Sequence, residues 1–365
     1  MSTLDESHGF VWNAESYRPR VQPVFVMKII ITGGAGFIGC NAASRYLVRD
    51  HEVVVIDNLS RAGAERNLQW LKPQGRLTFL NEDIRNAEQI NQIFRTHQDA
   101  ELILHLAGQV AVTNSVANPR ADFEANALGT FNVLEAARLA DFQAPIIFSS
   151  SNKVYGGLED AGIVEREGRL AYSELSTGVS EQQNLDFHSP YGCSKGAADQ
   201  YVRDYHRIYG LQTVVFRQSC IYGYRQFGVE DQGWVAWFII ATMLGRPVTL
   251  YGDGKQVRDL LFIDDLLDAF DAAAANIDQT CGKVYNIGGG PRNLMSLREL
   301  LDYIGEKQDR PVVYERADWR PGDQKVYVSD IRKAKDEFGW SPKICVKRGL
   351  DLLYDWVSTN KELFQ

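Results

Sequence analysis

The sequence contains few cysteines, and none of them is spaced for a disulfide framework or a metal site. The five are Cys40, Cys193, Cys220, Cys281 and Cys345, an odd number with no C-x-x-C pair. Secreted scaffolds held by disulfides carry paired cysteines, so this pattern favours a reduced, cytoplasmic protein. None of the six histidines stands in a metal-ligand spacing such as H-E-x-x-H. We therefore expect no bound metal.

Positive charge and long apolar runs are also lacking. Acidic residues outnumber basic ones by 47 to 39, giving a formal charge of −8, which is not the electrostatic signature of a nucleic-acid-binding protein. No segment reaches the roughly 18 apolar residues of a membrane span. The longest apolar run, 235–244, is predicted to be a buried or interface helix. Residues 1–26 contain Asp5, Glu6 and no continuous apolar core, so they are predicted to form a loose N-terminal arm and not a signal peptide.

The composition is that of a globular protein, and the length of 365 residues predicts about two domains. From Met27 onward, apolar runs alternate with helical patterns, as at 121–139 and 190–209. The expected strands, each apolar throughout, are at 27–32, 52–57, 77–83, 102–108, 144–151 and 213–219. Such strands are typical of a parallel sheet that is covered on both faces. We predict an α/β fold: a doubly wound (Rossmann) parallel sheet over 27–220, and a smaller mixed α/β C-terminal domain over 221–365 that binds substrate and returns some elements to the sheet. Residues 156–187 are polar and are expected to form a long surface insertion.

A glycine-rich segment, TGGAGFIG at 32–39, lies between the first strand and the first helix. It can be read as Gly34-x-Gly36-x-x-Gly39 or as Gly33-x-x-Gly36-x-x-Gly39. Either reading allows a tight turn that brings backbone close to a pyrophosphate at the start of a helix. Asp57 ends the second strand, 18 residues beyond Gly39, where its carboxylate can accept hydrogen bonds from the adenosine ribose and repel a 2′-phosphate. The pattern therefore predicts a dinucleotide site that prefers NAD to NADP.

Further cofactor contacts are expected where the other strands end. Arg61 is open to two interpretations, since it can bind a phosphate or stack over the adenine. Asp83 and Ile84 follow the third strand and are expected to meet the adenine. The full predicted cofactor set is Gly33, Gly36, Phe37, Ile38, Gly39, Asp57, Asn58, Ser60, Arg61, Asp83, Ile84, Leu106, Ala107, Gly108, Asn126, Ser149, Tyr191 and Lys195.

Tyr191 and Lys195 stand four residues apart in a predicted helix, so their side chains share one face. A tyrosine has an ordinary pKa of about 10. A neighbouring ammonium, together with the positive charge of NAD⁺ in a dry cleft, is expected to lower it and make the phenol a usable base. The fifth strand ends in three serines, of which Ser151 is the candidate to hold the substrate oxygen that Tyr191 deprotonates. Serines at strand ends also form turns, so the choice among the three stays open at this point.

These motifs together resemble the nucleotide-sugar epimerases and dehydratases of the extended short-chain dehydrogenase/reductase superfamily. The resemblance rests on the glycine motif, Asp57, HLAG at 105–108, Ser151, Tyr191-x-x-x-Lys195, QVRD at 256–259 and RPGD at 320–323. It implies NAD chemistry with Tyr191 as acid and base, Lys195 as its activator and ribose contact, and Ser151 as the oxygen ligand. It also implies a second domain that holds a nucleotide-diphosphate sugar, and a homo-oligomer, commonly a dimer.

Two residues after Ser151 narrow the reaction. Family members that dehydrate sugars resemble one another in an Asp-Glu pair there, whereas this chain has Asn152 and Lys153, which cannot supply carboxylate acid–base chemistry. Segments 57–71, 148–156, 186–201 and 224–238 resemble most the epimerases that act at C2 of a CDP-linked dideoxy sugar, enzymes of lipopolysaccharide O-antigen biosynthesis. We therefore expect oxidation of the sugar followed by reduction from the opposite face.

Substrate contacts are predicted from arginines and nearby polar groups. Arg258 and Arg320 are the expected clamp on the diphosphate, because guanidinium binds phosphate oxygens in bidentate fashion. Asn152 and Gln109 could touch the sugar, although Gln109 could equally cap the next helix. The predicted substrate set is Gln109, Asn152, Arg225, Gln226, Arg258, Arg320 and Asp323. His188 is expected to be structural.

Three other functions stay open on the sequence. The same motifs would serve a UDP-sugar 4-epimerase, since only the resemblance places the chemistry at C2. A net NAD(P)H-dependent nucleotide-sugar reductase would use the same phenol and lysine. A protein that binds NAD without catalysis would not require Ser151, Tyr191 and Lys195.

Overall fold

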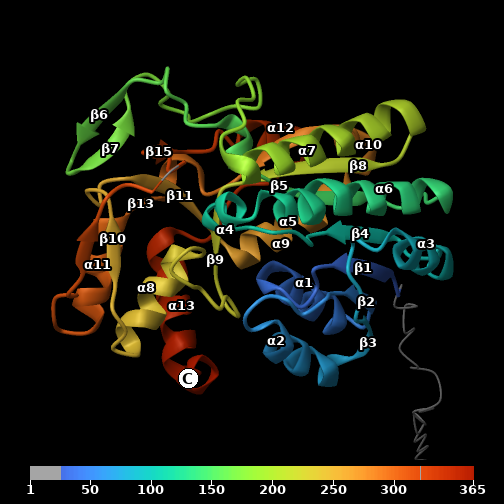
Figure 1. The fold of residues 1–365 in the computed structure, drawn as a ribbon, viewed down its shortest axis with the longest axis horizontal. Coiled ribbons are helices and arrows are strands. Elements are labelled where there is room, and N and C mark those ends of the chain that lie inside the picture. Colours follow the sequence, from blue (N-terminus) through green and yellow to red (C-terminus); the bar gives the residue numbers. More distant parts are fainter. Residues whose placement is uncertain (1–25, 321) are drawn as a thin grey trace, which may run out of the picture.

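The computed structural model describes residues 26–320 and 322–365, so residues 1–25 of the predicted N-terminal arm lie outside the described part. A sheet of seven parallel strands in the order β12-β8-β5-β4-β1-β2-β3 forms the centre (Figure 1). The strand order reverses between β1 and β4, which confirms the predicted doubly wound sheet. The strands are β1 (Lys28–Thr32), β2 (Glu52–Ile56), β3 (Arg76–Leu80), β4 (Leu102–His105), β5 (Ile146–Ser151), β8 (Thr213–Gln218) and β12 (Val284–Ile287).

Helices cover both faces of this sheet because alternate residues of each strand point to opposite sides. Ile29 and Ile31 face one hydrophobic core, and Ile30 faces the other. The first core is covered by α1 (Phe37–Leu47) and α9 (Ile263–Ala275), and the second by α3 (Ala87–Thr96), α6 (Gly129–Leu139) and α7 (Ser189–Tyr209). Two-sided burial explains why the strands are apolar throughout.

The C-terminal part is mixed α/β, and it supplies β12 to the edge of the large sheet. Its β11 (Val257–Phe262) pairs in parallel with β9 (Cys220–Tyr222) and β15 (Val326–Tyr327), and antiparallel with β13 (Leu294–Ser296). A second pair joins β10 (Thr249–Tyr251) to β14 (Glu315–Ala317). Around them pack α8 (Trp234–Met243), α11 (Leu297–Lys307) and α13 (Val346–Thr359). Most of α8 is buried, which confirms the helix predicted for the run at 235–244.

Shorter elements complete the described chain. The helix predicted at 121–139 is three pieces, because a π-helical stretch at Glu124–Leu128 separates α5 (Pro119–Phe123) from α6. The other short elements are α2 (Ala64–Leu71), α4 (Val112–Ala117), α10 (Ile277–Thr280), α12 (Arg332–Phe338) and the 3₁₀ turns Lys72–Gln74, Asn152–Tyr155, Gly290–Arg292 and Lys361–Phe364.

The predicted insertion at 156–187 is more ordered than its polar sequence indicates. It contains a hairpin of β6 (Ile163–Arg166) and β7 (Arg169–Tyr172), seen at the upper left of Figure 1. Leu158, Tyr172 and Val179 join a small apolar cluster with Tyr155 and Tyr327. These apolar residues have no regular spacing, so periodicity alone does not reveal them. Within the described residues, no helix is long and apolar enough to cross a membrane.

Candidate active site

A cavity of about 360 Å³ lies between the carboxyl ends of the central strands and the C-terminal part of the chain. In parallel α/β sheets this edge is where ligands bind, beside the point where the strand order reverses. The predicted site residues that line the cavity are Phe37, Ile38, Leu106, Ser149, Ser151, Asn152, Tyr191, Lys195, Gln226, Arg258, Arg320 and Asp323. The fold thus brings together residues that are up to 286 positions apart, from Phe37 to Asp323.

The three serines at the end of β5 have different environments. Ser150 donates a hydrogen bond from Oγ to Asp199 Oδ2 at 3.0 Å and faces the protein interior. All three serines line the cavity, but Ser149 and Ser151 point to the other side of the strand from Ser150, as alternation along a strand requires. The Ser150 hydroxyl is bound to a buried carboxylate, whereas Ser151 Oγ makes only longer local bonds, to Asn152 Oδ1 at 3.4 Å and from Lys153 N at 3.2 Å. Ser149 and Ser151 are therefore the candidates for a substrate contact. The Ser151 hydroxyl is the one that interacts with the phenol of Tyr191.

Tyr191 and Lys195 lie one turn apart near the start of α7, and both are buried. The backbone N–H of Tyr191 donates to Ser115 Oγ at 3.1 Å, which fixes this first turn against α4. Lys195 Nζ donates to the carbonyl oxygen of Ser149 at 2.8 Å. The ammonium therefore reaches across from α7 to the end of β5, next to the cavity.

Lys195 alone does not make the phenol acidic. Burial raises the pKa of Tyr191 to about 12, which the Ser151 hydroxyl offsets only in part. Burial also lowers the pKa of Lys195 to about 8, and the carboxylate of Asp122 opposes this shift. Desolvation outweighs the attraction because both charged forms lose water in the same cavity. An acidic phenol therefore requires further positive charge at the site.

The glycine turn has the shape of a pyrophosphate cradle. Gly33 has a φ of +70°, and a Cβ on Gly39 would lie 2.2 Å from the Gly33 carbonyl oxygen, so neither position tolerates a side chain. A Cβ on Gly36 would meet only that same oxygen, at 3.2 Å. Gly36 caps α1 with no side-chain hydrogen bond, and the first turn of α1 carries no acidic residue. The free N–H groups and the helix dipole fit an anion such as a pyrophosphate.

Asp57 is held in place beside this turn. Its Oδ2 accepts from Ala35 N at 3.0 Å and its Oδ1 from Leu59 N at 2.8 Å. Each carboxylate oxygen keeps a second lone pair, so Asp57 can still accept from two ribose hydroxyls. Burial raises the pKa of Asp57, and its backbone hydrogen bonds oppose the shift. Arg61 donates from Nη2 to Gln232 Oε1 at 2.6 Å. Neither the phosphate contact nor the adenine stacking predicted for Arg61 includes this bond.

The remaining predicted cofactor residues fall into two groups. Asn58, Ser60, Ala107 and Gly108 lie in the loops at the same sheet edge. Asp83 is there too, but its carboxylate accepts from Asn58 and Arg85, and these bonds lower its pKa to about 2. The other group consists of Ile84 and Asn126, whose side chains face the protein interior. This corrects the prediction that these two side chains contact the cofactor. Ile84 packs against Gly129 in the core, and Asn126 is fully buried, bonding to Gln109 N, Asp122 and Ser194.

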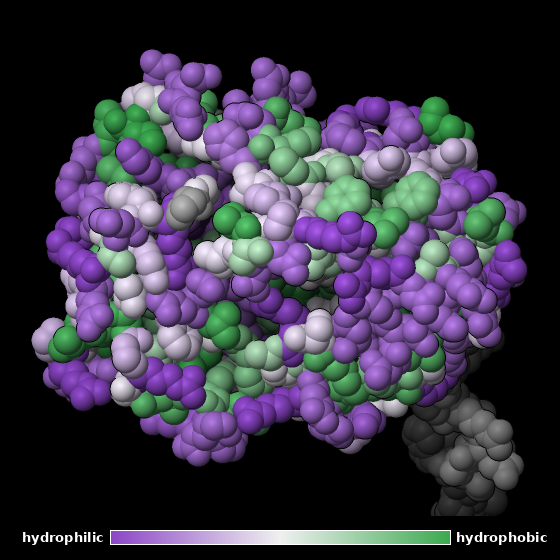
Figure 2. All heavy atoms as spheres, in the orientation of Figure 1, coloured by the Kyte–Doolittle hydropathy of each residue, from purple (hydrophilic) through white to green (hydrophobic). Residues whose placement is uncertain are grey.

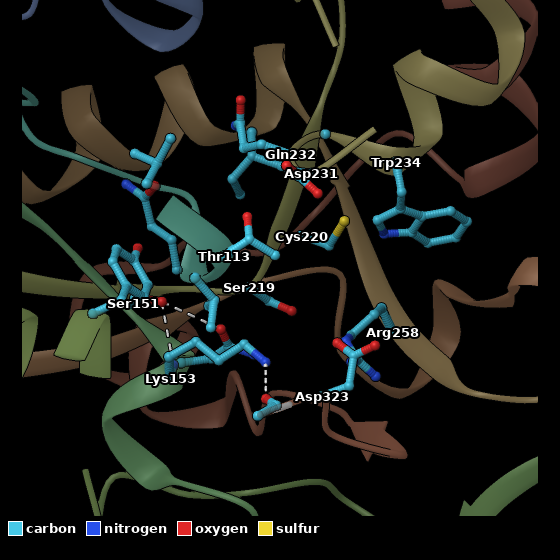
Figure 3. A pocket seen from close by; sticks show the side chains of 18 of the residues that line it. Thr113, Ser151, Lys153, Ser219, Cys220, Asp231, Gln232, Trp234, Arg258 and Asp323 are labelled. Atoms are coloured by element: carbon cyan, nitrogen blue, oxygen red, sulfur yellow. Dashed lines mark hydrogen bonds between the residues drawn. The ribbon is translucent and has the colours of Figure 1, made fainter. Parts of the chain in front are cut away.

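On the substrate side, a basic cluster formed by Lys153 and Arg258 adjoins Asp323 (Figure 3). Lys153 Nζ donates to Gly322 O at 3.1 Å, and Arg258 Nη2 donates to Gln324 O at 2.6 Å. Burial and the charge of Arg258 lower the pKa of Lys153 to about 8, while Asp323 opposes the shift. Two cations with one carboxylate between them fit an anionic ligand such as a diphosphate.

Arg320 completes the opposite wall of the cavity. Its guanidinium stacks on Tyr251, 3.6 Å from the ring centroid. Asn152 and Gln226 are nearly buried in the wall. Asn152 donates to Gln324 Oε1 at 3.4 Å, whereas Gln226 Oε1 has no hydrogen-bond partner among the described residues.

Two predicted substrate residues do not reach the cavity. Gln109 uses its side chain within its own loop, where Nε2 donates to Ala111 O at 2.8 Å and Asp122 Oδ1 at 2.7 Å. It does not cap the next helix either, because α4 has no side-chain cap. Arg225 points to a different surface hollow, with its guanidinium 4.3 Å from the Trp70 ring centroid. Its backbone has a φ of +62°, and this left-handed turn directs it away from its neighbour Gln226.

Several cavity residues were not predicted from the sequence. Among them are Thr113, Lys153, Gln218, Ser219, Cys220, Glu230, Asp231, Gln232, Trp234, Tyr251 and Gln256. For Lys153 the sequence leaves a substrate contact and a structural role in a turn equally open, and the structure places it at the cavity. Trp234 is the first residue of α8, directly after the Gly233 cap, and it is only partly buried. Among the described residues, no group of three or more His, Cys, Asp or Glu side chains is arranged to hold a metal ion.

Comparison with known proteins agrees with this geometry. Residues 29–288 match the NAD dependent epimerase/dehydratase family. The chain is 45% identical over 338 residues to CDP-paratose 2-epimerase of Salmonella typhi, covering 91% of this chain and 100% of that protein. Its structure is similar to that of a UDP-glucose 4-epimerase from Thermotoga maritima with UDP-glucose (TM-score 0.78, 29% identity, 92% and 100% coverage). It is also similar to a dTDP-glucose 4,6-dehydratase from Streptomyces venezuelae with NAD bound (TM-score 0.79, 28% identity, 93% and 99% coverage).

Proposed function

The chain belongs to the NAD dependent epimerase/dehydratase family, whose members act on nucleotide sugars with NAD, and from this premise we propose that it inverts C2 of a CDP-linked dideoxy sugar. The observation that carries the choice is the 45% identity to CDP-paratose 2-epimerase over the whole of that protein. The cavity supports it, because Asn152 and Lys153 stand on the wall directly after Ser151. A dehydratase of this family would need a carboxylate pair at those positions.

NAD, when bound, accepts hydride from the sugar carbon and returns it. The residues that fit NAD are the Gly33–Gly39 turn for the pyrophosphate and Asp57 for the ribose. Lys195, at the nicotinamide end of the same sheet edge, is placed to contact the second ribose. The positive charge of oxidised NAD would also lower the pKa of Tyr191, because it favours the phenolate over the neutral form.

Tyr191 then moves the proton in both half-reactions. Its phenolate removes the proton of the C2 hydroxyl while Ser151 holds that oxygen. The 2-keto sugar turns over in the cavity, and Tyr191 returns the proton to the oxygen when the opposite face is reduced. General acid–base catalysis of this kind contributes about 10²–10⁴-fold.

The diphosphate must stay anchored while the sugar turns. We assign this task to Arg258 and Arg320, which reach the cavity from different segments of the C-terminal part, together with Lys153. A volume of about 360 Å³ is at the lower end of the range for ligand cavities. Because the diphosphate is anchored by these residues, the sugar is the part of the substrate that can turn.

Product analysis tests the proposal. The purified protein is incubated with CDP-, UDP-, dTDP- and GDP-sugars in deuterated water, and products are identified by NMR. We expect inversion at C2 of the CDP-sugar, no deuterium at that carbon, and no net change in NADH absorbance. Inversion at C4 of a UDP-sugar would replace the proposal with a 4-epimerase. Stoichiometric consumption of NADH or NADPH would replace it with a reductase.

We also propose that the protein is a homodimer formed through α5–α6 and α7. Phe123, Phe131, Tyr201, Ile208 and Tyr209 are exposed on these helices, and Figure 2 shows hydrophobic side chains over this upper right part of the surface. A patch of this kind on a soluble enzyme indicates an interaction surface. Light scattering should give twice the monomer mass for the wild type and the monomer mass for Phe131→Glu with Tyr201→Glu. Val313→Glu, exposed elsewhere, is the control.

A cytoplasmic location and a role in lipopolysaccharide O-antigen precursor synthesis complete the proposal. All five cysteines, which lie within the described residues, are free thiols, in keeping with a reducing compartment. Deletion of the gene should remove the C2-inverted sugar from the cell-surface polysaccharide. Retention of that sugar would contradict the role.

A further inference from the structure

The loop between β9 and α8 ends in a tight turn whose tip carries two carboxylates. Val229 and Gln232 exchange backbone hydrogen bonds, with N···O distances of 3.0 and 2.9 Å. Glu230 and Asp231 form the two-residue tip between them, are exposed, and line the mouth of the cavity. Figure 3 shows Asp231 and Gln232 on the opposite side of the pocket from Lys153 and Asp323. We call residues 227–233 the strap.

The tip of the strap binds Arg320. Arg320 Nη1 donates to Glu230 O at 3.0 Å, and Nη2 lies 3.7 Å from Glu230 Oε1 and 3.4 Å from Asp231 Oδ1. Tyr251 stacks under the guanidinium and also donates from its hydroxyl to Glu230 Oε1 at 2.9 Å. The edge of Arg320 that would bind a phosphate is therefore already in contact with two anions.

The other end of the strap is tied to the cofactor half of the chain. Gln232 accepts the hydrogen bond of Arg61, and Phe227 packs against Gly63, where a Cβ would lie 2.1 Å from its ring. These contacts join the strap to the loop between β2 and α2, which carries the predicted adenosine contacts. The strap thus spans from that loop to Arg320 across the cavity mouth.

We propose that Glu230 and Asp231 act as internal anions that compete with the substrate diphosphate for Arg320 and thereby set how tightly the nucleotide is held. This inference rests on the proposed function, in which Arg320 binds that diphosphate. Both contacts between carboxylate and guanidinium exceed 3.2 Å, and the side chains of Arg320, Glu230 and Asp231 are 20, 42 and 46% exposed. Exposed pairs of this kind are weak and exchange partners easily. A diphosphate offers bidentate, charge-assisted hydrogen bonds to the same donors.

Removal of the two tip carboxylates is expected to strengthen CDP binding. The variant Glu230→Gln with Asp231→Asn keeps the size of the tip and removes both charges. Its Kd for CDP, measured by calorimetry, should fall about 1.5- to fivefold, the range that corresponds to an exposed ion pair of about 0.2–1 kcal/mol. Its Kd for cytidine, which has no phosphate, should not change.

Two comparisons make the test specific. The control Glu315→Gln with Asp318→Asn removes the same charge from exposed positions near Arg320, and its Kd for CDP should stay at the wild-type value. In a chain that carries Arg320→Gln, removing the tip carboxylates should no longer tighten CDP. Unchanged or weaker CDP binding by the tip variant, an equal gain for cytidine, or a gain that survives Arg320→Gln would overturn the inference.

Failure of the inference and failure of the proposed function are separable. If CDP binds and the tip variant has no effect, the strap is not a competitor, whatever the product analysis gives. If the tip variant tightens CDP but no C2 epimer forms, the strap inference stands and the reaction is different. If no nucleoside diphosphate among CDP, UDP, dTDP and GDP binds, both fail.

Discussion

Asp199 and Arg217 form a buried, bidentate ion pair between α7 and β8. Arg217 Nε lies 2.9 Å from Asp199 Oδ2, and Arg217 Nη2 lies 2.9 Å from Asp199 Oδ1. Asp199 also accepts a hydrogen bond from Ser150 on β5. Tyr191, Lys195 and Asp199 are spaced four residues apart, so they lie on the same face of α7. The pair therefore fixes the position of α7 against β5, and with it the position of Tyr191 relative to Ser151.

Asp199→Asn should destabilise the protein strongly. The variant leaves the charge of Arg217 buried without its partner, so we expect the free energy of unfolding to fall by about 3 kcal/mol. Urea denaturation measures this loss, and kcat should fall as well because α7 is no longer held in position against β5. Asp204→Asn, at an exposed position of the same helix, should stay within about 0.5 kcal/mol of the wild type. A stability equal to that of the wild type would show that the ion pair does not anchor α7.

Tyr191→Phe should remove catalysis and leave the fold intact. The ring keeps its packing while the proton carrier is lost, so kcat should fall about 10²–10⁴-fold, with little change in the affinity for NAD. Ser151→Ala should have a smaller effect in the same direction, because it removes the hydrogen bond to the substrate oxygen. Tyr354→Phe, on α13 and outside the cavity lining, is the control. A Tyr191→Phe enzyme with wild-type activity would rule out the phenol as acid and base and would support a protein that only binds NAD.

Lys195→Met should abolish activity and raise stability at neutral pH. The pKa of Lys195 falls from its ordinary value of 10.5 to about 8 on folding, so the folded state is disfavoured whenever this lysine is charged. We expect the variant to gain about 2 kcal/mol at pH 7, less than the full linkage value of about 3.4 kcal/mol because the bond to Ser149 O is lost.

The pH dependence of that gain has a definite sign. Between pH 8 and pH 10.5 the unfolded chain binds more protons at Lys195 than the folded chain, so wild-type stability rises with pH relative to the variant. The advantage of Lys195→Met should therefore be full below pH 8 and shrink as the pH approaches 10.5. Denaturation at pH 7 and pH 9.5 measures the two differences. A constant difference would contradict the lowered pKa.

Asp57→Asn should weaken NAD binding and reduce the preference for NAD over NADP. Losing the charge weakens the acceptor for the ribose hydroxyls by about 1–2 kcal/mol, which is roughly five- to thirtyfold in Kd. Fluorescence titration with both cofactors gives the two constants. The NADP constant should change less or improve, because the repulsion of the 2′-phosphate is removed. An unchanged ratio would mean that Asp57 does not select the cofactor.

Local motifs account for much of the fold and for one half of the site. The glycine turn, Asp57 and the Tyr191/Lys195 spacing are each set by neighbours in the sequence, so their chemistry can be derived without coordinates. The substrate side is different. Gln109, predicted as a sugar contact, bonds to Asp122, and Arg225 turns toward Trp70 because of its left-handed backbone. Neither contact has a signature in the residues adjacent to these two.

What the sequence determined by itself is the alternation of buried strands and helices, the position of the glycine turn and the helical register of Tyr191 and Lys195, because these depend on periodicity and on steric limits of single residues. What only the tertiary structure decided is which side chains share the cavity and how they ionise. Burial and the contacts of Glu230, Asp231 and Arg320 join segments far apart in the chain, and desolvation acts on Tyr191 only once α7 and β5 have enclosed it.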